Sequence, residues 1–219
     1  MRLTAPDGHE FDAYTAEPAA PAKAAVVIIQ EIFGVNGHIR SVADDYARQG
    51  YWAIAPAVFD RVRRSLQLSY GPEDRKKGMQ VATQVGLDAA LKDVEASLKY
   101  AEERFGKKKV AVVGFCWGGT LAWLAATRLQ PAAAVGYYGG QIAKHAAEKP
   151  NCPVLLHFGE KDAHIPKSEI DTIRRHHPGL TIFLYNAGHG FNCDQRESYD
   201  PPSAALARQR TLEFLHKHI

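Results

Sequence analysis

The segment from Gly114 to Thr120, GFCWGGT, holds a cysteine in the glycine spacing of a nucleophile elbow. Gly114 and Gly118 lie two positions before and two positions after Cys116. This spacing is typical of a sharp strand-to-helix turn that exposes a hydrolase nucleophile, because glycines remove the Cβ atoms that would collide in such a turn. A structural cysteine in a tight turn is the alternative interpretation, since cysteine is among the most buried residue types.

Short apolar runs alternate with amphipathic segments along the chain, and the runs predict strands covered by helices on both faces. Strands are expected at 25–29, 52–55, 110–113, 133–137, 154–158 and 181–185, with an edge strand at 9–14. Helices are expected near 38–49, 79–104, 117–129, 166–177 and 203–218. No linker divides the series, so we expect one α/β domain over residues 1–219, built on a single mainly parallel, twisted sheet.

Reactive residues follow four of these strands. In a mainly parallel sheet the functional site lies beyond the carboxyl ends of the strands. Glu31, Cys116, Asp162 and His189 each come just after a predicted strand. The chain order nucleophile, acid, histidine is that of the α/β-hydrolase arrangement. The pattern therefore predicts acyl transfer in which His189 takes the thiol proton and Asp162 fixes the imidazole tautomer.

The loop after the first long strand offers two further groups. A helix that begins at Trp117 would direct its free N–H groups and the positive end of its dipole at the nucleophile. We expect the amides of Trp117 and Ile32 to donate to a developing oxyanion. Glu31 precedes Ile32, and two interpretations of it stay open: a carboxylate used at the site, or an exposed loop residue.

The acid and base roles have competitors in Glu160, Asp194, His157 and His164. Asp162 is preferred because it follows its strand by a few residues and precedes the next helix. His157 lies inside a strand pattern and is interpreted as a core histidine. His164 is a candidate for the rim of the cleft.

Composition excludes several classes of function. The chain has 27 basic and 24 acidic residues, a net charge of +3, and no nucleic-acid-binding motif, so the basic run 107–109 is interpreted as a solvated strand entrance. Three cysteines without a Cys-x-x-Cys or Cys/His cluster favour neither a disulfide scaffold nor zinc. The glycines of the elbow match neither the dinucleotide nor the P-loop pattern. We expect a cytoplasmic monomer without metal, cofactor, nucleic-acid or membrane partners.

Four segments together resemble the dienelactone hydrolase family of α/β-hydrolases: 30–36 (QEIFGVN), 114–119 (GFCWGG), 159–162 (GEKD) and 187–191 (AGHGF). The resemblance covers nearly the whole chain. It implies a triad of Cys116, Asp162 and His189, with Glu31 as the family's additional glutamate. In that family the resting cysteine is neutral and passes its proton to the glutamate when substrate displaces that side chain. The thiolate then attacks the ester carbonyl, and water hydrolyses the thioester.

The chain departs from this pattern where substrate is bound. Family members specialised for dienelactone carry an arginine four residues past the histidine, where this chain has Cys193, and Arg196 is shifted along the chain. Cys193 is expected to line the pocket or to pack, and Cys152 to lie in the core. The resemblance implies a second substrate arginine around 61–76. The candidate substrate contacts are Arg61, Arg63, Arg64, Arg75, Tyr70, Tyr138 and Phe191.

The leading hypothesis is a cysteine hydrolase of a small ester or lactone that works through a thioester intermediate. A hydrolase of C–C bonds or of thioesters on the same scaffold is an alternative, because the elbow, the acid and the base serve the cleavage of ester, C–C and thioester bonds alike. A non-enzymatic protein whose thiol senses electrophiles is a third possibility. The pair of Asp162 and His189 argues against it, since a sensor needs no group to fix an imidazole tautomer.

Overall fold

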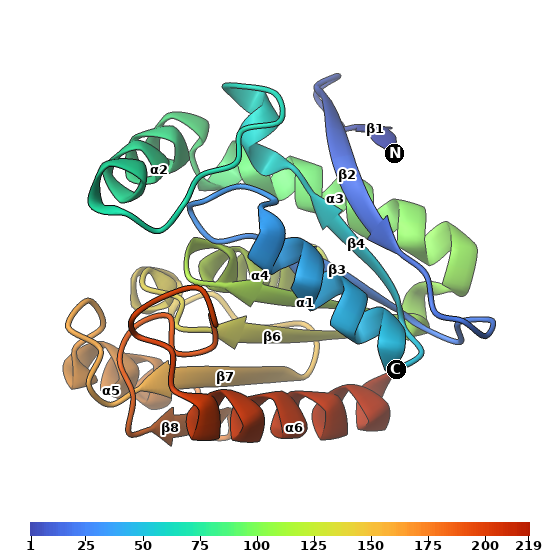
Figure 1. Cartoon of the computed structure of the whole chain (residues 1–219). Helices are drawn as coiled ribbons and strands as arrows, with labels where there is room; N and C mark the ends of the chain where they lie inside the picture. Colours follow the sequence, from blue (N-terminus) through green and yellow to red (C-terminus); the bar gives the residue numbers. More distant parts are fainter.

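A single twisted sheet of eight strands runs through the computed structural model, which describes all residues from 1 to 219 (Figure 1). The strand order is β1-β2-β4-β3-β5-β6-β7-β8, antiparallel at β1, β2 and β4 and parallel from β4 to β8. The strands are β1 (Arg2–Thr4), β2 (Glu10–Ala16), β3 (Ala25–Ile29), β4 (Trp52–Pro56), β5 (Val110–Phe115), β6 (Ala133–Tyr137), β7 (Val154–Gly159) and β8 (Thr181–Tyr185).

Helices cover both faces of this sheet (Figure 1). The α-helices are α1 (Gly37–Arg48), α2 (Pro72–Val85), α3 (Leu87–Phe105), α4 (Trp117–Arg128), α5 (Lys167–His176) and α6 (Pro201–His218), with short 3₁₀ helices η1 (Val58–Arg61), η2 (Lys107–Lys109) and η3 (Ile142–His145). Helices α1 and α6 pack on one face, and α3 and α4 pack on the other. The central strands β3, β5, β6 and β7 are buried along their whole length, as expected of parallel strands between two helical layers. The predicted α/β sheet with helices on both faces is confirmed.

The structure differs from the sequence prediction at two places. The single helix expected near 79–104 is two helices, because Gly86 has a φ of 73° and turns the chain between α2 and α3. The first of them begins earlier, at Pro72, which is favourable at the start of a helix. The strand expected at the sheet edge, now β2, lies between β1 and β4, and the short β1 forms the edge.

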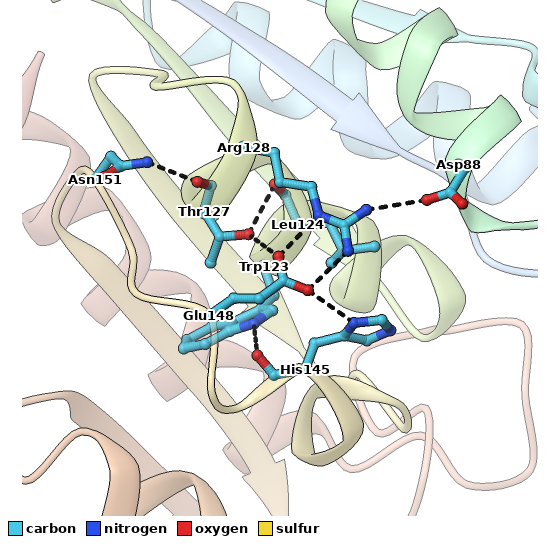
Figure 2. A network of polar contacts seen from close by, with 8 residues as sticks. All are labelled: Asp88, Trp123, Leu124, Thr127, Arg128, His145, Glu148 and Asn151. Atoms are coloured by element: carbon cyan, nitrogen blue, oxygen red, sulfur yellow. Dashed lines mark hydrogen bonds and ion pairs between the residues drawn. The ribbon is translucent and has the colours of Figure 1, made fainter.

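Helix α4 connects the elbow to the far side of the molecule. It starts directly after Cys116, and its residues from Trp117 to Ala126 are all buried. Its last turn is fixed by ion pairs and hydrogen bonds around Arg128 and Glu148 (Figure 2). No helix in the chain has the length and apolar character needed to cross a membrane.

Candidate active site

Three side chains from distant parts of the chain meet at the carboxyl ends of β5, β7 and β8. The Sγ atom of Cys116 lies 3.1 Å from Nε2 of His189. The other ring nitrogen of His189, Nδ1, lies 2.7 Å from Oδ2 of Asp162. Oδ1 of Asp162 accepts a hydrogen bond of 2.8 Å from the backbone amide of His164. The structure thus brings the predicted thiol, imidazole and carboxylate into one hydrogen-bonded chain.

The backbone of Cys116 explains why glycines surround it. Cys116 has a φ of 55° and a ψ of −118°, a left-handed conformation that costs a side chain about 1 to 3 kcal/mol. A Cβ atom on Gly114 would overlap the carbonyl oxygen of Gly118, and one on Gly118 would overlap those of Ile29 and Gln30. The strained turn therefore depends on close backbone approaches that only glycine permits. It leaves Cys116 partly exposed between two buried elements.

Charges at this site favour a protonated imidazole once the Cys116 thiol has lost its proton. Burial by itself lowers the pKa of His189, but the Cys116 sulfur and the Asp162 carboxylate outweigh it and raise the pKa to about 10. Burial alone would raise the pKa of Asp162, yet its hydrogen bonds to His189 and to the His164 amide keep that pKa below its ordinary value. The carboxylate is therefore ionised at neutral pH and fixes Nδ1–H as the donor.

The two backbone amides predicted to receive an oxyanion, those of Trp117 and Ile32, donate to no other protein group. Trp117 is the first residue of α4, where helical geometry supplies no acceptor, and Ile32 lies in the loop after β3. That loop is closely packed, because a Cβ atom on Gly78 of α2 would overlap the carbonyl oxygen of Ile32 and one on Gly34 would overlap that of Leu66. The predicted pair of amides is thus held on rigid segments with its N–H groups free.

Glu31 is buried and carries an arginine partner. Its side chain is 1% exposed, and Oε1 accepts a hydrogen bond of 3.0 Å from Nη1 of Arg196. Burial lowers the pKa of Arg196, but Glu31 and Cys116 outweigh it and raise that pKa above its usual value. Gly190, with a φ of 78°, has no Cβ atom, and the guanidinium of Arg196 therefore packs directly on the backbone next to His189. The interpretation of Glu31 as an exposed loop residue is therefore wrong, and Arg196, although shifted in sequence, reaches the glutamate.

Two of the predicted substrate arginines, Arg61 and Arg64, are bound by other protein groups. The guanidinium of Arg61 is bound on both sides, by Asp93 at 2.7 Å and by Asp7 at 3.0 Å. Arg64 donates to the carbonyl oxygen of Glu10 on β2. Because these donors are engaged by carboxylates and a backbone carbonyl, a substrate contact by Arg61 or Arg64 would require an exchange of these bonds, and their substrate role stays a prediction. Arg63 and Arg75 are exposed, and only Arg75 lies on α2, the helix that packs over the Ile32 loop.

Two of the three aromatic candidates, Tyr138 and Phe191, pack beside His189. The ring of Tyr138 lies 5.1 Å from that of His189 and 5.5 Å from that of Phe191, and both aromatic side chains are fully buried. The Tyr138 hydroxyl has no hydrogen-bond partner. Tyr70 packs against Phe33 and accepts a hydrogen bond from Asn36. These contacts make Tyr138 and Phe191 a wall behind the imidazole.

The competing residues have other roles in the structure. His157 is fully buried between the hydroxyls of Tyr185 and Thr211, and burial lowers its pKa to about 3. Its interpretation as a core histidine is confirmed. Cys193 is buried near Glu31, and Cys152 is half-buried.

Sequence reasoning missed His38 and its contact with Asp194. His38 lies in the first turn of α1, is buried, and places Nδ1 3.1 Å from Oδ1 of Asp194. No spacing in the sequence connects these two residues, which are 156 positions apart. The Asn36 side chain that caps α1 also binds the 66–70 loop through the Leu68 carbonyl.

Comparisons with known proteins agree with this architecture. The sequence model of the family described as "Dienelactone hydrolase family" matches residues 11–219. The chain is 34% identical to a carboxymethylenebutenolidase of Pseudomonas putida, over 95% of this chain and 92% of that protein. It is 35% identical to a putative carboxymethylenebutenolidase of Synechocystis, over 94% and 91% of the two chains. A putative dienelactone hydrolase from Klebsiella pneumoniae has a similar crystal structure, with a TM-score of 0.86, 31% identity and coverage of 98% and 97%.

Proposed function

The chain belongs to the dienelactone hydrolase family of α/β-hydrolases, and from this premise we propose that it hydrolyses a small ester or lactone with Cys116 as the nucleophile. The observation that carries the proposal is the hydrogen-bonded chain from Cys116 through His189 to Asp162, built on a strained elbow. A residue held in left-handed backbone geometry at a strand end is a costly feature, and such features persist at functional sites.

The proposed reaction begins with transfer of the thiol proton of Cys116 to a base. The sulfur then attacks the carbonyl carbon, and the amides of Ile32 and Trp117 receive the oxyanion. Protonated His189 gives its proton to the leaving oxygen, which releases the alcohol and leaves a thioester on Cys116. Water attacks this thioester while His189 takes its proton, the C–S bond breaks and the acid leaves, and the Cys116 sulfur regains a proton from the base, His189 or Glu31, which restores the thiol. Throughout the cycle Asp162 holds the ring and stabilises its cationic form.

Two groups can act as the first base. Nε2 of His189 is already 3.1 Å from the sulfur, and Glu31 has a second oxygen, Oε2, without a partner. Arg196 holds the other oxygen of Glu31. A substrate carboxylate that binds Arg196 would free Glu31, so the geometry favours an ester or lactone that itself carries a carboxylate. The relatives named carboxymethylenebutenolidase support the same substrate class.

The proposal is tested with a panel of esters, lactones and thioesters, each with and without a carboxylate. Wild type is expected to prefer the carboxylate-bearing lactones and esters. Cys116→Ala should lose at least about 10³-fold in kcat/KM, because no other side chain supplies the nucleophile. The matched control is Cys152→Ala, which removes a half-buried thiol outside the hydrogen-bonded chain. Full activity of Cys116→Ala would contradict covalent catalysis, and a preference for thioesters would favour the alternative chemistry.

Glu31→Gln and His189→Gln separate the two bases. If His189 alone activates the thiol, Glu31→Gln should retain most of kcat/KM. If Glu31 takes the proton after substrate displaces it, Glu31→Gln should lose about 10²-fold, the usual contribution of a general base, chiefly on substrates that carry a carboxylate.

A further inference from the structure

A second cysteine and a second histidine lie together beside Glu31. The Sγ atom of Cys193, a ring nitrogen of His38 and a carboxylate oxygen of Glu31 all lie within 4.8 Å of one another, and all three residues are buried. None of the three takes part in the contacts among Cys116, His189 and Asp162. The cluster joins three separate segments: the loop after β3, the first turn of α1 and the loop before α6.

Two polar atoms in this cluster have no hydrogen-bond partner. They are Oε2 of Glu31 and Nε2 of His38, on side chains that are 1% and 4% exposed. Leaving such atoms unpaired in a buried position is unfavourable, so a bound species that accepts their lone pairs would be stabilising. Both atoms belong to the same three-residue cluster.

The surroundings of His38 prepare its ring for a metal ion. Nδ1 lies 3.1 Å from Oδ1 of Asp194, so Nδ1 carries the proton and Nε2 presents a lone pair. A carboxylate behind the ring is the usual arrangement around a histidine that binds zinc. The Glu31 carboxylate is prepared in a similar way, because Arg196 holds Oε1 and leaves Oε2 free.

We propose that Glu31, His38 and Cys193 form a binding site for a divalent transition-metal ion of the zinc class. Thiolate, imidazole and carboxylate are the three ligand types that zinc prefers. Zinc bonds of about 2.0 to 2.3 Å place two ligand atoms at most about 4.6 Å apart, so small side-chain rotations bring the three atoms onto one ion. On binding, Cys193 loses its thiol proton to solvent and its sulfur becomes the ligand. The fourth position stays open for water.

The charges support one divalent ion at this place. The carboxylate of Glu31 and the thiolate of Cys193 together neutralise the ion, and Asp194 behind His38 offsets the nearby positive charge of Arg196. The binding of the metal ion does not depend on the proposed function. The inhibition that it would cause rests on the proposed function, because an ion on Oε2 of Glu31 would keep this carboxylate from accepting the Cys116 proton.

Cobalt(II) absorption tests the site directly in the Cys116→Ala protein, which removes the other thiol–imidazole pair. We expect a one-to-one complex with thiolate-to-cobalt charge-transfer absorption, and displacement of cobalt by zinc. Cys193→Ser in this background should abolish the absorption, and His38→Gln or Glu31→Gln should weaken binding. Asp194→Asn should weaken it about tenfold through the histidine. The matched control is Cys152→Ala, which should retain the absorption.

Zinc should also raise the Tm of the Cys116→Ala protein and not that of its His38→Gln derivative, which provides a second readout if Cys193→Ser folds poorly. Retained absorption in Cys193→Ser, or no absorption and no Tm shift at millimolar metal, would overturn the proposal and leave a buried water as the occupant.

Zinc should inhibit hydrolysis by the wild-type enzyme. It should leave the rate of the His38→Gln variant equal to the rate that this variant shows without metal. If cobalt binds but zinc does not inhibit hydrolysis, the metal site is supported and the role of Glu31 as acceptor of the Cys116 proton is contradicted.

Discussion

Helix α4 begins at the Cys116 elbow and ends in a network around Arg128, and the polar groups at its two ends are arranged in opposite ways. At the far end, Arg128 donates to Asp88 and twice to Glu148, which also accepts from Thr127 and contacts His145 (Figure 2). The indole N–H of Trp123 and the amide of Asn151 donate to backbone carbonyls of the same network (Figure 2). Each charged group there has a partner.

At the elbow, in contrast, buried polar atoms are left without partners. They include Oε2 of Glu31 and the hydroxyl of Tyr138, and the backbone of Cys116 is strained. Unpaired atoms and strain reduce stability, yet they leave donors and acceptors available for a ligand. Helix α4 thus separates two tasks: its C-terminal end stabilises the fold and its N-terminal end holds reactive groups.

The largest expected effect is on activity at the elbow. Asp162→Asn should lower kcat/KM by about 10³- to 10⁴-fold, because an amide neither fixes the imidazole tautomer nor stabilises its cation. The measurement is the hydrolysis rate of an activated ester. Glu160→Gln, two residues away and exposed, is the matched control and should retain the wild-type rate. An Asp162→Asn rate above a tenth of wild type would remove Asp162 from the proposed mechanism.

The next effect is on the fold of the elbow itself. Gly114→Ala should reduce the free energy of unfolding by about 3 kcal/mol or more, because its Cβ overlaps the Gly118 carbonyl oxygen within rigid backbone. Urea unfolding measures this loss. Gly179→Ala is the control, since a Cβ atom there meets nothing within 4 Å. Equal stability of the two variants would show that the turn can relax and would weaken the argument from strain.

A substitution at the C-terminal end of α4 should lower the stability of the protein and leave its activity unchanged. Arg128→Met removes the contacts to Asp88 and Glu148 and should reduce the free energy of unfolding by about 1 to 2 kcal/mol, since the group is partly exposed and solvent screens it. Its kcat/KM should stay within about twofold of wild type, because changes away from the reacting atoms rarely reach catalysis. A tenfold loss of kcat/KM in this variant would mean that the two ends of α4 are coupled.

The smallest effect is a difference in pH dependence. Hydrogen bonds from Arg128 lower the pKa of Glu148 to about 2, so its stabilising contribution is present above pH 4.5 and is lost as the pH falls toward 2. The pKa of His189 is raised to about 10, so its contribution is full below pH 6.5 and is lost as the pH rises through 10.

Urea unfolding as a function of pH measures both contributions. Glu148→Gln should flatten the acid side of the stability curve by about 1 kcal/mol, and His189→Gln should flatten the alkaline side. Parallel curves for these two variants would contradict the separation of the two ends.

Local patterns predicted most of this fold, because buried parallel strands and amphipathic helices leave clear periodicities. The break at Gly86 was missed since the apolar spacing continues on both sides of it, and β1 was missed because three residues are too few for a pattern. In the site, glycine spacing and strand-end positions indicated the three residues of the hydrogen-bonded chain.

The remaining features of the site depend on long-range packing. Arg196 reaches Glu31 only because Gly190 lets it pass, and His38 meets Asp194 and Cys193 through folding of the whole chain. Arg61 has the right charge at the expected place in the sequence, but its guanidinium is engaged by the carboxylates of Asp7 and Asp93. Sequence spacing does not contain this information, because it arises from tertiary contacts.

The proposed mechanism requires that the Cys116 sulfur carry the acyl group of the substrate. Acid quenching during turnover of an activated ester, followed by mass spectrometry of the peptides, measures this directly. We expect the acyl mass on the peptide that contains Cys116, and its loss in Cys116→Ala. Steady turnover without an acylated Cys116, or with the acyl group on Cys152 or Cys193, would contradict it.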